Sequence, residues 1–149
     1  MSVIENVVVG ALVRQRHALK ARAKAYEILD YAGITGRAGQ PAGELTPPEK
    51  RRLEIARALA TGPKLLLLDE VLTGLTPSEA KAGVDLVRRV RASGVTVVMV
   101  EHVMEVVMPL VDRAIVLNLG EVLAEGAPAE VVRNPAVIAA YLGDRHRAA

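Results

Sequence analysis

Residues 65–70 read Leu-Leu-Leu-Leu-Asp-Glu, and this stretch decides the fold class. An unbroken apolar run is typical of a strand that is buried on both faces, as in a parallel sheet covered by helices. A carboxylate at the carboxyl end of such a strand lies at the crevice where open α/β sheets bind their ligands. The alternative is a core strand that ends in two solvated acids. Context favours the ligand-binding interpretation, because a second apolar strand ends in Glu101-His102.

The composition excludes several classes of function. The chain has 149 residues, of which 51% are apolar, and its only aromatic residues are three Tyr, so we expect one domain, or two small lobes, with an aliphatic core. The absence of Cys excludes disulfides, thiolate metal sites and a Cys nucleophile. A net charge of +2, with basic residues that lack aromatic partners, argues against nucleic acid as a partner. Without a signal peptide or an apolar run of ~20 residues, the sequence predicts a soluble cytoplasmic protein.

Helices dominate the first part of the chain, and strands alternate with helices in the second. A capping box at Ser2 and Glu5 begins the first helix, a basic second helix covers 19–32, a loop follows over 34–47, and a third helix covers 47–60. The alternation after residue 63 implies a mainly parallel sheet. The expected strands are 65–69, 95–100, 114–118 and 121–124, the last two as a hairpin, and the expected helices are 77–92, 103–111, 128–133 and 135–142.

Several segments together resemble one known family. They are SVIENVVVGA, LTPPEKRRLEIARALATGPKLLLLDE, GLTPSE, GVTVVMVEH and EGAPAEVVRNPAVIAAYLG. In this combination and order they resemble the ATP-binding subunits of ABC transporters, most closely the type for uptake of branched-chain amino acids. The resemblance covers essentially the whole chain and implies an α/β fold. Residues 1–63 would form an ABC-type helical subdomain, and residues 64–149 the C-terminal half of a P-loop NTPase (RecA-like) core.

The resemblance also implies roles for the acids and the histidine at the strand ends. Asp69 matches the Walker B aspartate, which holds Mg²⁺ through water, and Glu70 matches the catalytic glutamate beside it. His102 matches the switch-loop histidine, whose imidazole contacts the γ-phosphate of ATP and the attacking water. The implied cofactors are therefore ATP and Mg²⁺, with Glu70 and His102 as the catalytic residues.

Two further motifs of the family would contact ATP across a dimer. The signature, usually Leu-Ser-Gly-Gly-Gln, would hold the γ-phosphate of ATP bound to the opposite subunit, through a hydroxyl and the backbone N–H groups at a helix N-terminus. Its position is occupied by Leu45, Thr46, Pro47, Pro48 and Glu49. The D-loop, which crosses the dimer interface, is occupied by Thr73, Gly74, Leu75 and Thr76.

The chain departs from the family pattern at both motifs. Two prolines replace the signature glycines and supply no N–H donors, and Glu49 adds negative charge near a phosphate. Thr46 keeps a hydroxyl, and Thr76 replaces the D-loop aspartate, so both contacts across the dimer are expected to be weakened. No Gly-x-x-x-x-Gly-Lys-Ser/Thr occurs, so the chain lacks the family's phosphate loop, and the adenine-stacking aromatic and Q-loop are missing with it. We therefore expect a fragment in which strand 65–69 leaves part of its apolar surface uncovered.

Three functional interpretations stay open from the sequence. The first is an ATP-binding and ATP-hydrolysing subunit of an ABC importer for branched-chain amino acids, or its C-terminal part. It would work with permease subunits and a second ATP-binding subunit, on the inner face of the cell membrane, and would be inactive alone. The second is a non-catalytic interaction module that pairs with an intact ATPase subunit or a permease. The third is a truncated gene product without function.

Overall fold

The structure, a computed structural model, describes residues 1–142. The chain forms two compact units, of which the first ends at His102 and the second begins at Val103, and each unit is described by itself. The predicted division of the chain at residue 63 stays a prediction.

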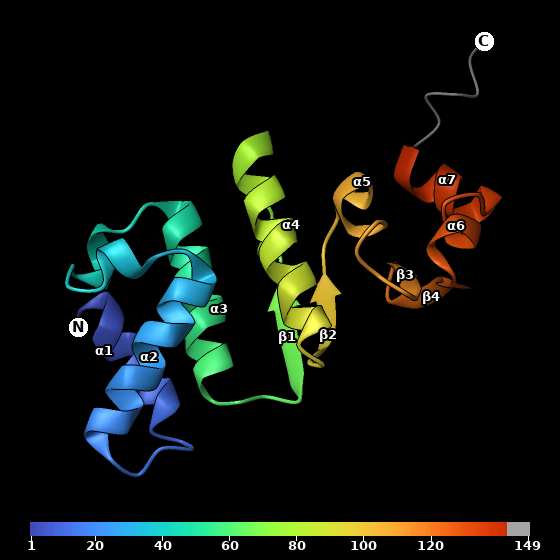
Figure 1. Cartoon of the computed structure of the whole chain (residues 1–149). Helices are drawn as coiled ribbons and strands as arrows, with labels where there is room; N and C mark the ends of the chain where they lie inside the picture. The colour runs from blue at the N-terminus through green and yellow to red at the C-terminus, as the bar shows by residue number, and fades with distance from the viewer. Residues whose placement is uncertain (143–149) are drawn as a thin grey trace. The chain divides into compact units, whose positions relative to one another are not determined.

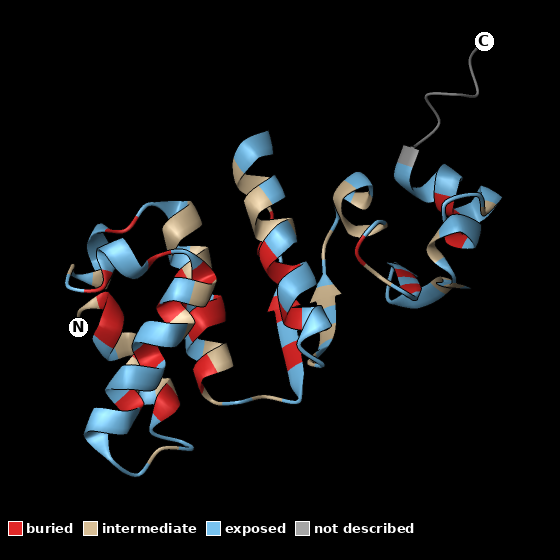
Figure 2. Ribbon diagram, in the orientation of Figure 1, coloured by how far each residue is buried: buried red, intermediate tan, exposed pale blue. Residues whose placement is uncertain are grey.

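The first unit begins with three helices packed on one another: α1 (Val3–Ala11), α2 (Ala18–Ala32) and α3 (Pro47–Ala60) (Figure 1). The predicted capping box is confirmed, since the Ser2 N–H donates to Glu5 Oε2 over 2.7 Å. The buried residues of the three helices face one another and form a single aliphatic core, in which Leu29 is fully buried (Figure 2). Two short 3₁₀ helices, η1 (Thr35–Arg37) and η2 (Ala42–Glu44), lie in the predicted loop.

A two-stranded parallel sheet forms the rest of the first unit. Strand β1 (Leu65–Asp69) pairs with β2 (Thr96–Val100) in register, from Leu65 opposite Thr96 to Asp69 opposite Val100. Helix α4 (Pro77–Ala92) connects the two strands and packs against β2. The predictions of a strand at 65–69, a helix at 77–92 and parallel pairing are confirmed, and β2 begins one residue later than predicted.

One face of this sheet is covered and the other is open. Leu66 and Leu68 are buried, as are three residues of α4, Leu86, Val87 and Val90. On the opposite face Leu65 is 51% exposed, Leu67 69%, Val98 49% and Val100 61%. The expected uncovered apolar surface on strand 65–69 is therefore confirmed, and it extends onto β2.

The second unit contains the helix α5 (Met104–Val107), an antiparallel hairpin and two C-terminal helices. The hairpin consists of β3 (Ala114–Asn118) and β4 (Glu121–Gly126), and α6 (Pro128–Val131) and α7 (Pro135–Leu142) follow it. The predicted hairpin and the helix at 135–142 are confirmed. A small core of aliphatic residues joins these elements around Val116 and Val131.

Two predicted helices of the second unit are shorter than expected. The helix predicted over 103–111 ends at Val107, because Pro109 has no N–H for an intrahelical hydrogen bond. The chain instead closes a turn, in which the Leu110 N–H donates to the Val107 carbonyl over 2.8 Å. The helix predicted over 128–133 ends at Val131, and its last residues form turns of the same kind.

Candidate functional site

The carboxyl ends of β1 and β2 bring Glu70 and His102 together. The Glu70 N–H donates to the Val100 carbonyl over 2.9 Å, which continues the pairing of the strands by one residue. Glu70 then takes a left-handed backbone conformation, with a φ of 47°, which is costly for a residue with a side chain. His102 follows β2, and its Nδ1 lies 3.6 Å from Glu70 Oε1. Both side chains are more than half exposed, so a ligand can reach them from solvent.

Asp69 is the last residue of β1 and is exposed. Among residues 1–142 no group of three or more His, Cys, Asp or Glu side chains is placed to hold a metal ion. A single carboxylate nevertheless suits Mg²⁺ when phosphate oxygens and water complete its shell, because this ion keeps several waters and binds few protein ligands. Asp69 therefore fits Mg²⁺ only together with a nucleotide.

The loop that follows Glu70 is held by Glu101, to which the sequence analysis gave no role. Its Oε1 accepts a hydrogen bond from the Leu72 N–H over 2.8 Å, and its Oε2 accepts one from the Thr73 hydroxyl over 3.3 Å. These bonds join the end of β2 to the start of the predicted D-loop, Thr73–Thr76. The available signal was an acid directly after an apolar strand, the same signal that singled out Asp69.

The predicted D-loop ends in a helix cap. The Thr76 N–H donates to Glu79 Oε2 over 2.8 Å, and the Thr76 hydroxyl donates to the same oxygen over 2.6 Å. These bonds, the hydroxyl contact first, hold the pKa of the Glu79 carboxyl below its ordinary value. Gly74 has a φ of 73°, which a residue with a side chain rarely adopts, and Gly74 and Thr76 are exposed to solvent. The loop is thus fixed at Thr73 and at Thr76.

The signature position forms the start of α3. Leu45 is buried in the helical core, so its side chain does not face solvent. The Thr46 N–H and the Thr46 hydroxyl each donate to Glu49 Oε2 over 2.9 Å. The guanidinium of Arg37 donates to the other carboxylate oxygen, Oε1, over 2.7 Å. The Thr46 N–H, followed by Arg37, holds the pKa of the Glu49 carboxyl below its ordinary value, so this carboxyl is ionised at neutral pH.

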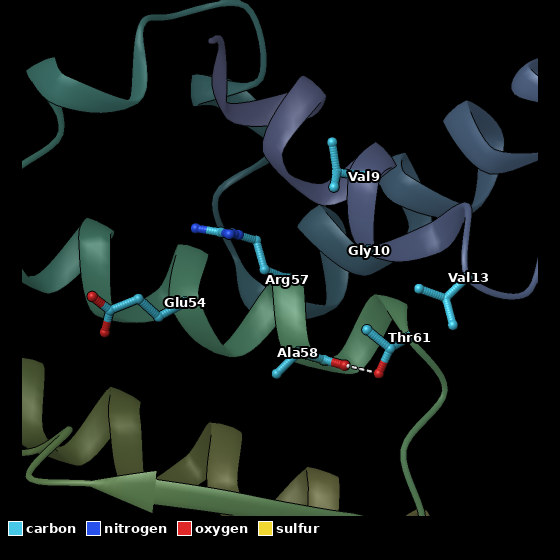
Figure 3. A pocket seen from close by; sticks show the side chains of 7 residues that line it. All are labelled: Val9, Gly10, Val13, Glu54, Arg57, Ala58 and Thr61. Carbon is cyan, nitrogen blue, oxygen red and sulfur yellow. Dashed lines mark hydrogen bonds between the residues drawn. The ribbon is translucent and has the colours of Figure 1, made fainter.

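A surface pocket lies elsewhere in the helical part, between α1 and the C-terminal half of α3 (Figure 3). Its wall is largely apolar and carries one acid and one base. The lining residues are Val9, Gly10, Val13, Glu54, Arg57, Ala58 and Thr61. None of them is a predicted site residue, and the Thr61 hydroxyl is used internally, because it donates to the Ala58 carbonyl over 2.8 Å.

Comparison with known families places the chain. The family described as "ABC transporter" matches residues 1–73, and the one described as "Branched-chain amino acid ATP-binding cassette transporter" matches residues 121–147. Among solved structures, the ATP-binding cassette MJ1267 in its ADP conformation superposes with a TM-score of 0.81 at 28% identity, over 96% of this chain and 63% of that one. A putative metal-chelate type ABC transporter shares the fold, with a TM-score of 0.86 at 22% identity, over 95% of this chain and 58% of the other.

Curated relatives agree with these matches. The high-affinity branched-chain amino acid transport ATP-binding protein BraF of Pseudomonas aeruginosa is 42% identical over 117 residues, which are 78% of this chain and 46% of the relative. The protein LivG of Escherichia coli K12, with the same description, is 38% identical over 97% of this chain and 63% of its own length. The methionine import ATP-binding protein MetN of Caulobacter vibrioides is 38% identical over 91% of this chain and 41% of its own length.

The fold is that of the nucleotide-binding cassettes of ABC transporters, within the P-loop NTPases. The chain belongs to the ABC transporter ATP-binding family. It spans between 41% and 63% of the length of the curated relatives named above. Within residues 1–142, no helix is both long enough and apolar enough to cross a membrane.

Proposed function

We propose that this chain supplies the catalytic end of an ATP-hydrolysing subunit of an ABC importer, and that the importer takes up branched-chain amino acids. The observation that carries the proposal is the 3.6 Å approach of His102 Nδ1 to Glu70 Oε1, at the carboxyl ends of two parallel strands. The substrate class rests on the relatives, whose names describe branched-chain amino acid transport. The methionine relative keeps other amino acids open as substrates.

The two exposed groups have complementary roles in this proposal. Glu70 accepts a proton from the attacking water or orients it, and His102 donates a hydrogen bond to the terminal phosphate of ATP. Asp69 holds Mg²⁺ through water, and the ion neutralises charge on the phosphates when it is bound. The bond of the Glu70 N–H to the Val100 carbonyl and the bond of Glu101 to the Leu72 N–H support these roles, because they hold the backbone at Glu70 and just after it.

The phosphate-binding loop has to come from residues outside this sequence. No Gly-x-x-x-x-Gly-Lys-Ser/Thr occurs in the 149 residues, so this chain has no backbone cradle for the β- and γ-phosphates. The open face of β1 and β2, around Leu67 and Val100, gives a complementing segment an apolar surface on which to pack. We propose that such a segment completes the nucleotide site, and that Thr73–Thr76 faces a second ATP-binding subunit.

The membrane partners are permease subunits, which the helical part, residues 1–63, contacts from the inner face of the cell membrane. A second candidate function is a non-catalytic module that pairs with an intact ATPase subunit or with the permease. One observation favours this alternative: at the signature position Thr46 directs both of its donors to Glu49 rather than to solvent.

A complementation assay separates the two candidates. The full chain is expressed with a segment that carries the family's phosphate loop, taken from a longer relative, and ATP turnover and ATP binding are measured separately. Glu70→Gln should retain ATP and lower turnover by about 10²–10⁴-fold, the usual contribution of general acid–base catalysis. His102→Ala should lower turnover more than binding, and Glu27→Gln, an exposed acid of α2 that pairs with Lys24, should change neither.

Two results would contradict the proposal. Unchanged turnover in the complemented Glu70→Gln or His102→Ala variant would remove that residue from the site. Turnover on the order of 1 s⁻¹ by the uncomplemented chain would show that no second segment is needed, since such a rate is ordinary for an enzyme.

A further inference from the structure

We infer that the carboxylate of Glu49 occupies the N-terminus of α3 and so prevents a nucleotide phosphate from binding there. Arg37 holds this carboxylate in place. The inference concerns the signature position and rests on the proposed function only in naming a nucleotide as the ligand that is excluded. The sequence predicts only that the negative charge of Glu49 is unfavourable near a phosphate. The structure adds the contacts through which Glu49 would exclude the phosphate.

Few donors at this helix start are available to a ligand. A helix N-terminus binds anions through the N–H groups of its first turn, which have no intrahelical partner. Here Pro47 and Pro48 carry no N–H. Thr46 has two donors, its N–H and its hydroxyl, and both go to Glu49 Oε2 over 2.9 Å. The Lys50 N–H is used within the helix, since it donates to the Thr46 carbonyl over 2.9 Å.

Arg37 makes the closure stronger than a capping box alone. Its Nε donates to Glu49 Oε1 over 2.7 Å, so each carboxylate oxygen has its own partners. The Glu49 side chain is 20% exposed, whereas the Arg37 side chain is 47% exposed. An incoming phosphate would have to displace the carboxylate from Thr46 and from Arg37 at once. It would also approach a group of its own charge, which is unfavourable in a partly buried site.

The chain contains a second copy of the same sequence pattern. Thr76-Pro77-Ser78-Glu79 begins α4, and there too the N–H and the hydroxyl of the Thr donate to the Glu, over 2.8 Å and 2.6 Å. The pattern Thr-Pro-x-Glu therefore acts in this protein as a device for starting helices. At α3 it occupies the place of the signature, and Arg37 adds a guanidinium contact.

An asymmetry follows for a dimer. ATP bound to the opposite subunit would receive no phosphate contact from the signature position at the start of this α3. A site that uses Glu70 and His102 of this chain depends on the signature of the opposite subunit instead. ATP turnover in a complex of the complemented chain with an intact subunit would then be confined to the second site.

Inorganic phosphate tests the closure on the full chain without any ATPase activity. The amide resonances of Thr46 and Lys50 are followed by NMR during a phosphate titration at constant ionic strength. The wild type should show no saturable shift at these amides. Glu49→Ala frees Thr46 and Arg37, and should bind phosphate at least about tenfold more tightly, because an anionic competitor is replaced by an open cationic site.

Two further variants make the result decisive. Glu79→Ala opens the matched box at α4 and should leave Thr46 and Lys50 as insensitive to phosphate as in the wild type. Glu49→Gln keeps the cap but removes its charge, and should gain part of the affinity even if Glu49→Ala weakens α3. The inference is overturned if the wild type binds phosphate at Thr46 as tightly as Glu49→Ala, or if neither Glu49 variant gains affinity. The phosphate titration needs no ATPase activity, so its result does not depend on the outcome of the complementation assay.

Discussion

Replacing Gly10 with alanine is a sharp test of the helical packing. Gly10 lies on α1 where this helix crosses α3, and it lines the pocket shown in Figure 3. A Cβ added at Gly10 would lie 2.5 Å from the Arg57 carbonyl oxygen and 3.1 Å from the Ala60 Cβ. Ordinary carbon–oxygen contacts are ~3.3 Å or longer. The backbone of α3 cannot rotate away as a side chain can, so the two helices would have to separate.

The expected loss of stability is about 1–2 kcal/mol. Overpacking of a tight contact costs about 1–3 kcal/mol, and a clash with backbone belongs in the upper part of this range, about 2–3 kcal/mol, from which the replacement of a helical Gly with Ala returns about 0.5–1 kcal/mol. Urea unfolding of the full chain, followed by far-UV circular dichroism, measures the free energy of unfolding. Gly36→Ala is the matched control, because its added Cβ meets no atom within 4 Å. Gly10→Ala with stability equal to or above that of the wild type would refute the close crossing of α1 and α3.

Two further predictions concern acid stability and the permease contact. Because hydrogen bonds lower the pKa of Glu49 and Glu79 in the folded state, they stabilise the fold above the ordinary pKa of 4.5 and are lost as the pH falls through the lowered values. The free energy of unfolding, measured with urea, should therefore decrease less below pH 4.5 for Glu49→Gln than for the wild type. An equal decrease would contradict this prediction. A photo-crosslinker at Val13, which is 68% exposed beside the pocket, should label co-expressed permease subunits, whereas one at Leu119, which is 97% exposed, should not. The reverse labelling would show that the helical part does not face the permease.

Elements whose signals lie within a few residues could be predicted from the sequence. The apolar run before Asp69 predicted β1 with its correct ends, and the helices predicted over 47–60 and 77–92 are α3 and α4 with the same bounds. Helix α5 was predicted too long because apolar spacing continues past Val107, and the missing N–H of Pro109 outweighs that spacing.

Contacts between distant residues could not be predicted in this way. The sequence placed Glu70 and His102 at the ends of two strands, but their separation of 3.6 Å depends on the parallel register of β1 and β2. The support that Glu101 gives to the loop joins residues 28 and 29 positions apart. No periodicity encodes such a bond, because a carboxylate after a strand can equally well point to solvent.

Local signals in the sequence were sufficient to predict most of the helices and strands, the family and the missing phosphate loop, because strand periodicity, helix caps and short motifs are local properties of the chain. By contrast, the tertiary structure was needed to show that Leu66 and Leu68 are buried while Leu65 and Leu67 are open. It alone decided that Glu49 closes the start of α3, because this depends on Arg37, which folds back from twelve residues earlier. The physical reason is the same in both cases: burial and charge pairing are set by which surfaces meet, and surfaces far apart in the chain meet only after folding.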